Sequence, residues 1–95
     1  MAKHRKPNKR YTPEYYEWRS KVLKRDGYKC QMPSCRKRSY KIQVHHIIKY
    51  STSYFLRLEV ANGITLCRTC HDSIKDKEHH FVELFRMIVE KNEKK

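Results

Sequence analysis

The chain has 95 residues with four cysteines, and its 23 Lys and Arg against 10 Asp and Glu give a formal net charge of +13. A chain of this length builds one small core, which rarely stabilises a fold without a disulfide or a metal. It contains no apolar run long enough to span a bilayer and no hydrophobic signal segment. These features exclude a membrane-spanning protein, and we expect an intracellular, cytoplasmic protein whose leading partner is nucleic acid.

Residues 1–11 are predicted to form a flexible basic arm, separate from a single domain over residues 12–95. The arm contains almost no apolar residue and therefore cannot bury itself against a core. One interpretation is a tail that keeps the protein soluble, and the other is an extension that grips phosphates. The basic residues of the arm are Lys3, Arg5, Lys6, Lys9 and Arg10.

A helix is predicted after the arm, because start and stop signals frame a stretch of helical periodicity. Thr12 can cap the helix and Pro13 fits its first position. Gly27 can close the helix in the left-handed conformation. The apolar stripe expected in the core consists of Tyr15, Trp18 and Val22. The basic residues off this stripe, expected to face solvent or a phosphate backbone, are Arg19, Lys21, Lys24 and Arg25.

Two cysteine pairs predict a structural zinc site. Cys30 and Cys35 surround a turn that contains Pro33, and Cys67 and Cys70 have the tighter two-residue spacing. Together they supply four sulfur ligands in a closed site, which stabilises a fold but catalyses nothing. Two disulfides are the alternative, but without a secretion signal the cell interior is expected to keep the thiols reduced.

The region between and after the cysteine pairs predicts an α+β fold with two strands and helices. Residues 42–47 and 63–66 have the composition of strands, and the segment 48–62 between them is long for a hairpin loop. A helix is expected to begin at Thr69 or Cys70, with an interruption near residues 76–78. Its apolar side is formed by Ile74, Phe81, Leu84, Phe85 and Ile88.

Three histidines remain without a role once four cysteines bind zinc. His71 would project about 100° from Cys70 on a helix, so it is free to bind a second metal. In a regular strand His45 and His46 point to opposite faces, and both can serve one reaction only if the strand bends or the site wraps its edge. The other histidines, His4, His79 and His80, are expected to be structural or exposed.

These histidines have the chemistry that phosphodiester hydrolysis requires. A neutral imidazole can accept a proton from the attacking water, and a divalent ion held by two further imidazoles can offset charge on the phosphate and the leaving oxygen. The amide of Asn62 can fix the direction of the base by tying the loop. Taken alone, however, Asn62 before Gly63 is typical of a turn.

The chain resembles the HNH endonucleases, of the ββα-metal or His-Me finger class. The residues that carry the resemblance are Trp18-Arg19, Arg25-Asp26-Gly27, Cys30 and Cys35, Val44-His45-His46-Ile47, and the run from Asn62 to His71. The resemblance implies a small zinc-stapled ββα-metal domain in which His46 is the general base, His45 and His71 bind the catalytic divalent metal, and Asn62 holds the base loop. It also implies structural zinc on the four cysteines and products with 5′-phosphate and 3′-hydroxyl ends.

Many members of this family have Asp where His45 stands here. An imidazole ligand accommodates Mn²⁺, Co²⁺, Ni²⁺ or Zn²⁺ more readily than an Asp site does, and Mg²⁺ stays among the candidates. The expected substrate is double-stranded DNA, nicked or cut through, with a targeting protein or a homodimer as open alternatives. Phosphate contacts are expected from the arm and from Arg19, Lys24, Arg25 and Arg68. A zinc-stabilised nucleic-acid-binding module without catalysis is the rival function.

Overall fold

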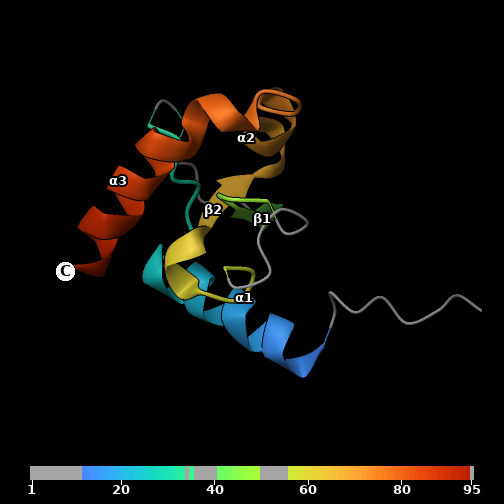
Figure 1. Cartoon of the computed structure of the whole chain (residues 1–95), viewed down its shortest axis with the longest axis vertical. Coiled ribbons are helices and arrows are strands. Elements are labelled where there is room, and N and C mark those ends of the chain that lie inside the picture. Colours follow the sequence, from blue (N-terminus) through green and yellow to red (C-terminus); the bar gives the residue numbers. More distant parts are fainter. Residues whose placement is uncertain (1–11, 34, 36–40, 50–55, 95) are drawn as a thin grey trace, which may run out of the picture.

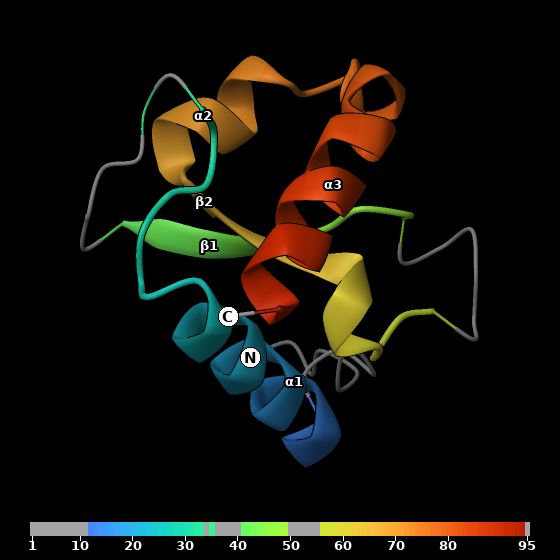
Figure 2. The same ribbon diagram turned by 90° about the vertical axis from the view of Figure 1, so that its left-hand side faces the viewer.

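The computed structural model describes residues 12–33, 35, 41–49 and 56–94, so the basic arm lies outside the described residues. The elements are α1 (Pro13–Arg25), β1 (Ile42–His46), the 3-10 turn η1 (Val60–Asn62), β2 (Gly63–Cys67), α2 (Arg68–Ser73), the 3-10 turn η2 (Glu78–Phe81) and α3 (Val82–Glu93). The two strands form an antiparallel sheet in the middle of the molecule, with α1 on one side and α2 and α3 on the other (Figure 1, Figure 2). The expected α+β architecture is confirmed.

The signals at both ends of α1 act as the sequence predicts. The Thr12 hydroxyl oxygen accepts a hydrogen bond from the Tyr15 N–H at 3.1 Å, which satisfies one of the free donors of the first turn. After the helix ends, Gly27 has a φ of +68°, the left-handed conformation expected of it. Trp18 and Val22 are buried as predicted, whereas Tyr15 is half-buried.

The strands agree with the predicted ones to within one residue. His46 pairs with Gly63 and His45 pairs with Ile64, so neighbouring side chains of β1 point to opposite sides of the sheet. On the side of α1, a Cβ atom added to Gly63 would lie 2.7 Å from side-chain carbons of both Trp18 and Val22. The absence of a side chain at Gly63 is what allows α1 to pack this closely on the sheet.

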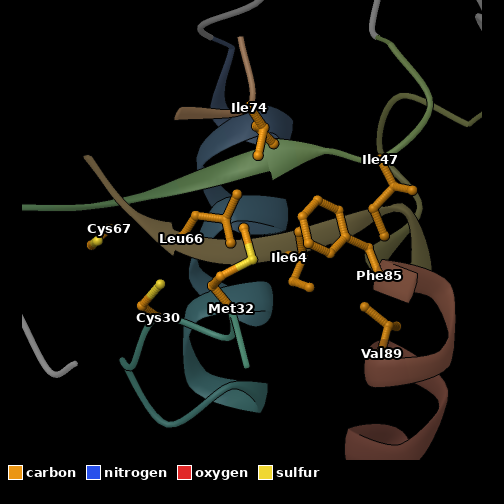
Figure 3. Packing of buried hydrophobic residues seen from close by; sticks show 9 residues of the cluster. All are labelled: Cys30, Met32, Ile47, Ile64, Leu66, Cys67, Ile74, Phe85 and Val89. Carbon is orange, nitrogen blue, oxygen red and sulfur yellow. The ribbon is translucent and has the colours of Figure 1, made fainter. Parts of the chain in front are cut away.

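On the other side of the sheet, the helical region is divided into α2 and α3. The helix begins at Arg68, slightly earlier than predicted, and the expected interruption is present because Asp76 adopts a left-handed φ of +68°. Phe85 packs beside Ile64 of the sheet, Ile74 belongs to the same cluster, and Cys30 and Cys67 lie together at one end of this core (Figure 3). The remaining predicted apolar positions, Phe81, Leu84 and Ile88, are partly buried against the same core.

Arg25 does not face solvent or a phosphate, and that prediction is wrong. Its side chain is only 9% exposed, and its guanidinium donates to both carboxylate oxygens of Asp26, at 2.8 and 2.9 Å. It also donates to the carbonyl oxygens of Val60 at 2.8 Å and Gly63 at 2.6 Å. The Val60 carbonyl also accepts from the Gly63 N–H within η1, so Arg25 adds a charged donor at the point where the chain enters β2.

The Asp26 carboxylate joins the same network from the other side. It accepts hydrogen bonds from the Thr65 N–H at 2.9 Å and from the Asn92 amide at 3.0 Å. The end of α1, the start of β2 and the end of α3 are therefore tied together by one buried ion pair. None of the helices described here is long and apolar enough to cross a lipid bilayer.

Candidate metal centre and active site

The four cysteines form one cluster, as the sequence predicts. Their sulfur atoms all lie within 4.8 Å of one another, and within the described parts of the chain no histidine or carboxylate joins this group. The sulfur atoms of Cys35 and Cys67 are 3.9 Å apart, and no disulfide links any of the four. A tetrahedral zinc site with Zn–S bonds near 2.3 Å has sulfur atoms about 3.8 Å apart, so this spacing fits such a site.

Two parts of the backbone position these thiols. In the first, the Cys35 N–H donates to the carbonyl of Met32 at 2.9 Å, and the Gln31 N–H holds the turn to β2 through the carbonyl of Thr65, also at 2.9 Å. In the second, Cys67 ends β2 and caps α2, because its sulfur accepts a hydrogen bond from the Cys70 N–H at 3.4 Å. The end of β2 and the first turn of α2 thus place Cys67 and Cys70 next to the other cysteine pair.

The thiols of the cluster can all ionise only if a cation is bound near them. Burial raises the pKa of Cys30, and burial together with hydrogen bonds to neighbouring thiols raises that of Cys70. Burial also opposes ionisation of Cys67, but its pKa is lowered overall because the Cys70 N–H and neighbouring thiols donate to its sulfur. Thiols this close cannot all ionise unless a positive charge neutralises them, and a metal ion supplies that charge.

A second group of possible ligands lies apart from the sulfur atoms, where His45 approaches His71. The two ring centroids are 5.3 Å apart, and the His45 ring also meets the Phe85 ring at 5.7 Å. Burial, and secondly the proximity of His71, lower the pKa of His45 to about 4. Its Nε2 atom is buried, and among the residues with described positions it has no hydrogen-bond partner.

His46 lies on the opposite side of the sheet, against α1. Its ring stacks on Trp18, with centroids 4.3 Å apart and the ring planes inclined by 16°. Its Nε2 atom is 2.9 Å from the carbonyl oxygen of Arg57. The strand is regular at this point, so the two neighbouring histidines face opposite ways, and His46 is the last residue of β1.

Asn62 ties together the two ends of the long segment between the strands. Its side-chain oxygen accepts from the Ile48 N–H at 2.9 Å, and its amide N–H groups donate to the carbonyls of Ile48 and Leu56, both at 3.1 Å. The side chain is buried, and Gly63 after it has an extended φ of −118°. Asn62 and Gly63 therefore do not form the tight turn that the dipeptide alone suggests.

The remaining predicted contact residues lie on the surface or outside the described chain. Lys24 and Arg68 are exposed, and Arg19 is half-buried. The guanidinium of Arg68 is 3.8 Å from the carboxylate of Asp72, one turn along α2. Sequence reasoning placed Trp18 in the core alone and missed its contact with His46. Its place on the same helix face as Val22 was visible, but its partner on β1 was not.

Comparison with known proteins yields one match. A family model described as HNH endonuclease matches residues 30–77, just over half of the chain. No curated protein matches, and neither does any solved structure. The matched range contains both cysteine pairs, the two adjacent histidines, Asn62 and His71. The chain belongs to the HNH endonuclease family.

Proposed function

We propose that this protein is a metal-dependent endonuclease that hydrolyses DNA phosphodiester bonds. The observation that carries the proposal is the separation of two sets of ligands: four thiols cluster alone, and His45 and His71 meet elsewhere. A module that needs metal only for its fold uses the first set and has no need of the second. The family supports a nuclease in general, and the roles below belong to the proposal.

His46 acts as the general base. A carbonyl oxygen can only accept, so the contact with Arg57 requires that the proton of the neutral ring is on Nε2. The lone pair is then on Nδ1, which takes the proton from the attacking water. The proposed products carry 5′-phosphate and 3′-hydroxyl ends.

His45 and His71 hold the catalytic divalent ion. The donor set fits such an ion, because the buried Nε2 of His45 has no partner in the described part of the molecule and its lowered pKa keeps the ring neutral at physiological pH. When bound, the ion offsets negative charge on the phosphate and the leaving oxygen. Mn²⁺, Co²⁺, Ni²⁺, Zn²⁺ and Mg²⁺ are the candidates, and Zn²⁺ is proposed for the four cysteines.

Asn62 holds the base in position through the segment of residues 56–62 that leads into β2. Its amide fixes the carbonyl of Leu56, and the next carbonyl, that of Arg57, contacts His46. His45 and His46 face opposite sides of the sheet and are the last two residues of β1, so the proposed site has to wrap around the end of this strand. Arg19, Lys24, Arg68 and the arm residues supply the proposed phosphate contacts, in agreement with the net charge of +13.

The test uses supercoiled plasmid and protein from which loosely bound metal has been removed by mild chelation. With Mn²⁺, Ni²⁺ or Mg²⁺ added back, wild type should nick or cut the plasmid, and His46→Ala should be at least about 100-fold slower while it keeps its zinc and its fold. His80→Ala is the matched control, because His80 is exposed on η2. Undiminished cutting by His46→Ala would exclude His46 as the base. If the wild-type protein binds DNA without cutting it, the protein is a non-catalytic zinc module.

A further inference from the structure

We propose that Trp18 is a positioning residue for the reaction, in that its indole fixes both the His46 ring and the segment to which that ring is hydrogen-bonded. This inference rests on the proposed role of His46 as the general base. Trp18 lies on α1, outside the matched range of residues 30–77, and reaches into that range by its contact with His46. Among the described residues it makes no ring contact with His45 or His71.

The first contact fixes the orientation of the His46 ring. Trp18 is only 2% exposed and packs against Gly63, the residue that pairs with His46 across the sheet. Because Gly63 has no side chain, the indole can lie under the strand end and stack on the imidazole at 4.3 Å with nearly parallel planes. The core holds the buried indole of Trp18 in place, and the indole thus prevents rotation of the His46 ring.

The second contact fixes the backbone to which the base is anchored. The Trp18 indole N–H donates to the carbonyl of Glu59 at 2.7 Å. His46 is bonded to the carbonyl of Arg57, two residues earlier in the same short segment. One rigid side chain therefore holds both the ring and the backbone segment that orients it, so that the two cannot move independently. Alignment of this kind determines how efficiently a base removes a proton.

If Trp18 had a purely structural role, the prediction would be different. Substitution of Val22 distinguishes a positioning role from a structural one. Val22 lies one turn along α1, is fully buried, and comes as close to a Cβ added at Gly63 as Trp18 does. Its side chain has neither a ring that can stack nor an N–H that can donate. If Trp18 only filled the core, substitutions at the two positions would affect cleavage in proportion to the stability that each removes.

The experiment compares three variants in the full chain with zinc bound. Trp18→Phe keeps a ring face but loses the indole N–H, Trp18→Leu loses both contacts, and Val22→Ala loses only packing. The single-turnover cleavage rate on saturating DNA should fall about tenfold for Trp18→Phe, the effect of one hydrogen bond. It should fall about 100-fold for Trp18→Leu, where the base is no longer aligned. Val22→Ala should cleave at the wild-type rate below its melting temperature, and DNA affinity should change by less than about twofold in all three.

A second measurement does not depend on activity. The His46 ring protons lie over the indole, so their NMR resonances should be shifted by its ring current and should move towards ordinary values in Trp18→Leu but not in Val22→Ala. Unchanged resonances in Trp18→Leu would overturn the proposal, and so would a cleavage rate that falls equally in Val22→Ala and Trp18→Leu. Full activity of His46→Ala would exclude the proposed base, on which this inference rests, but not the endonuclease activity. A wild type that does not cut would remove both proposals.

Discussion

The two neighbouring imidazoles of β1 lie in very different surroundings. His45 points into the core beside Phe85, where burial lowers its pKa to about 4 and leaves its Nε2 atom without a partner among the described residues. His46 points to α1, where an aromatic face and a carbonyl oxygen hold it. One residue of offset along a strand therefore places two imidazoles in opposite surroundings, which is why we propose different roles for them.

The burial of His45 predicts a pH dependence of stability. Its pKa is about 4 in the folded protein and ordinarily 6.5, so between these values the unfolded chain binds a proton that the folded chain does not. The stability of the folded protein is therefore unaffected by this group above about pH 6.5, and it decreases as the pH falls from there towards 4. In urea unfolding with zinc present and no other divalent ion, wild type should lose roughly 1 kcal/mol more than His45→Gln between pH 7.5 and 5.5. Equal losses would contradict this assignment, since the zinc thiolates contribute to both proteins.

The residue types of the site could be predicted from the sequence, but several of their contacts could not. The spacing of cysteines and histidines was sufficient to separate thiols from imidazoles, because ligand chemistry depends on residue type. The roles of Trp18 and Arg25 were not visible, because each contacts carbonyl groups about 35 to 41 residues away in the chain. Helical periodicity gives the face on which a residue lies but not its partner.

At the scale of elements, the packing of α1 on β2 depends on Gly63. Both ends of α1 and both strands could be predicted to within about a residue, because capping residues and alternating side chains act locally. The turn η1 was not predicted, because long-range hydrogen bonds hold it. Arg25 donates to the carbonyls of Val60 within the turn and Gly63 after it, and the Asn62 amide donates to the carbonyl of Leu56 before it.

Gly63→Ala should therefore destabilise the fold by about 1–3 kcal/mol, because the new methyl group would meet Trp18 and Val22 at 2.7 Å. Adding Val22→Ala should recover part of this loss, since it removes one of the two clashes. Gly27→Ala is the control: nothing lies within 4 Å of its added Cβ, so its cost comes only from the left-handed φ of +68°. Thermal unfolding of the four proteins gives the comparison. If Gly63→Ala had the stability of wild type, the close approach of α1 would be incorrect.

At the scale of the whole molecule, the main core is small, and Cys30 and Cys67 lie at one end of it (Figure 3). Twelve apolar residues are buried in the described part of the chain, and two of them are these cysteines. With a core of this size, zinc bound at the cysteines would supply a large share of the stability, since structural zinc contributes on the order of 10–16 kcal/mol of binding energy in small peptides.

The two sets of ligands should respond differently to substitution. Cys67→Ser should lose the fold and the activity together, because Cys67 is both a thiol of the cluster and the cap of α2. His71→Ala should keep one tightly bound zinc and the wild-type melting temperature, while cleavage becomes weak and requires more added metal. The measurements are the zinc content, the melting temperature by circular dichroism and the plasmid cleavage of both variants. Native melting of Cys67→Ser, or release of the tight zinc by His71→Ala, would show that the ligands are wrongly divided.

Cys70 and His71 are adjacent in α2, and one belongs to the thiol cluster while the other meets His45. In the proposed assignment, the first turn of this helix therefore supplies one ligand to the structural ion and one to the catalytic ion. In a newly synthesised chain that has not yet bound zinc, we expect His71 to have no fixed position. Such a chain should not cleave DNA. Loading of the scaffold ion would then act as a maturation step, which releases cleavage only in chains that have finished folding.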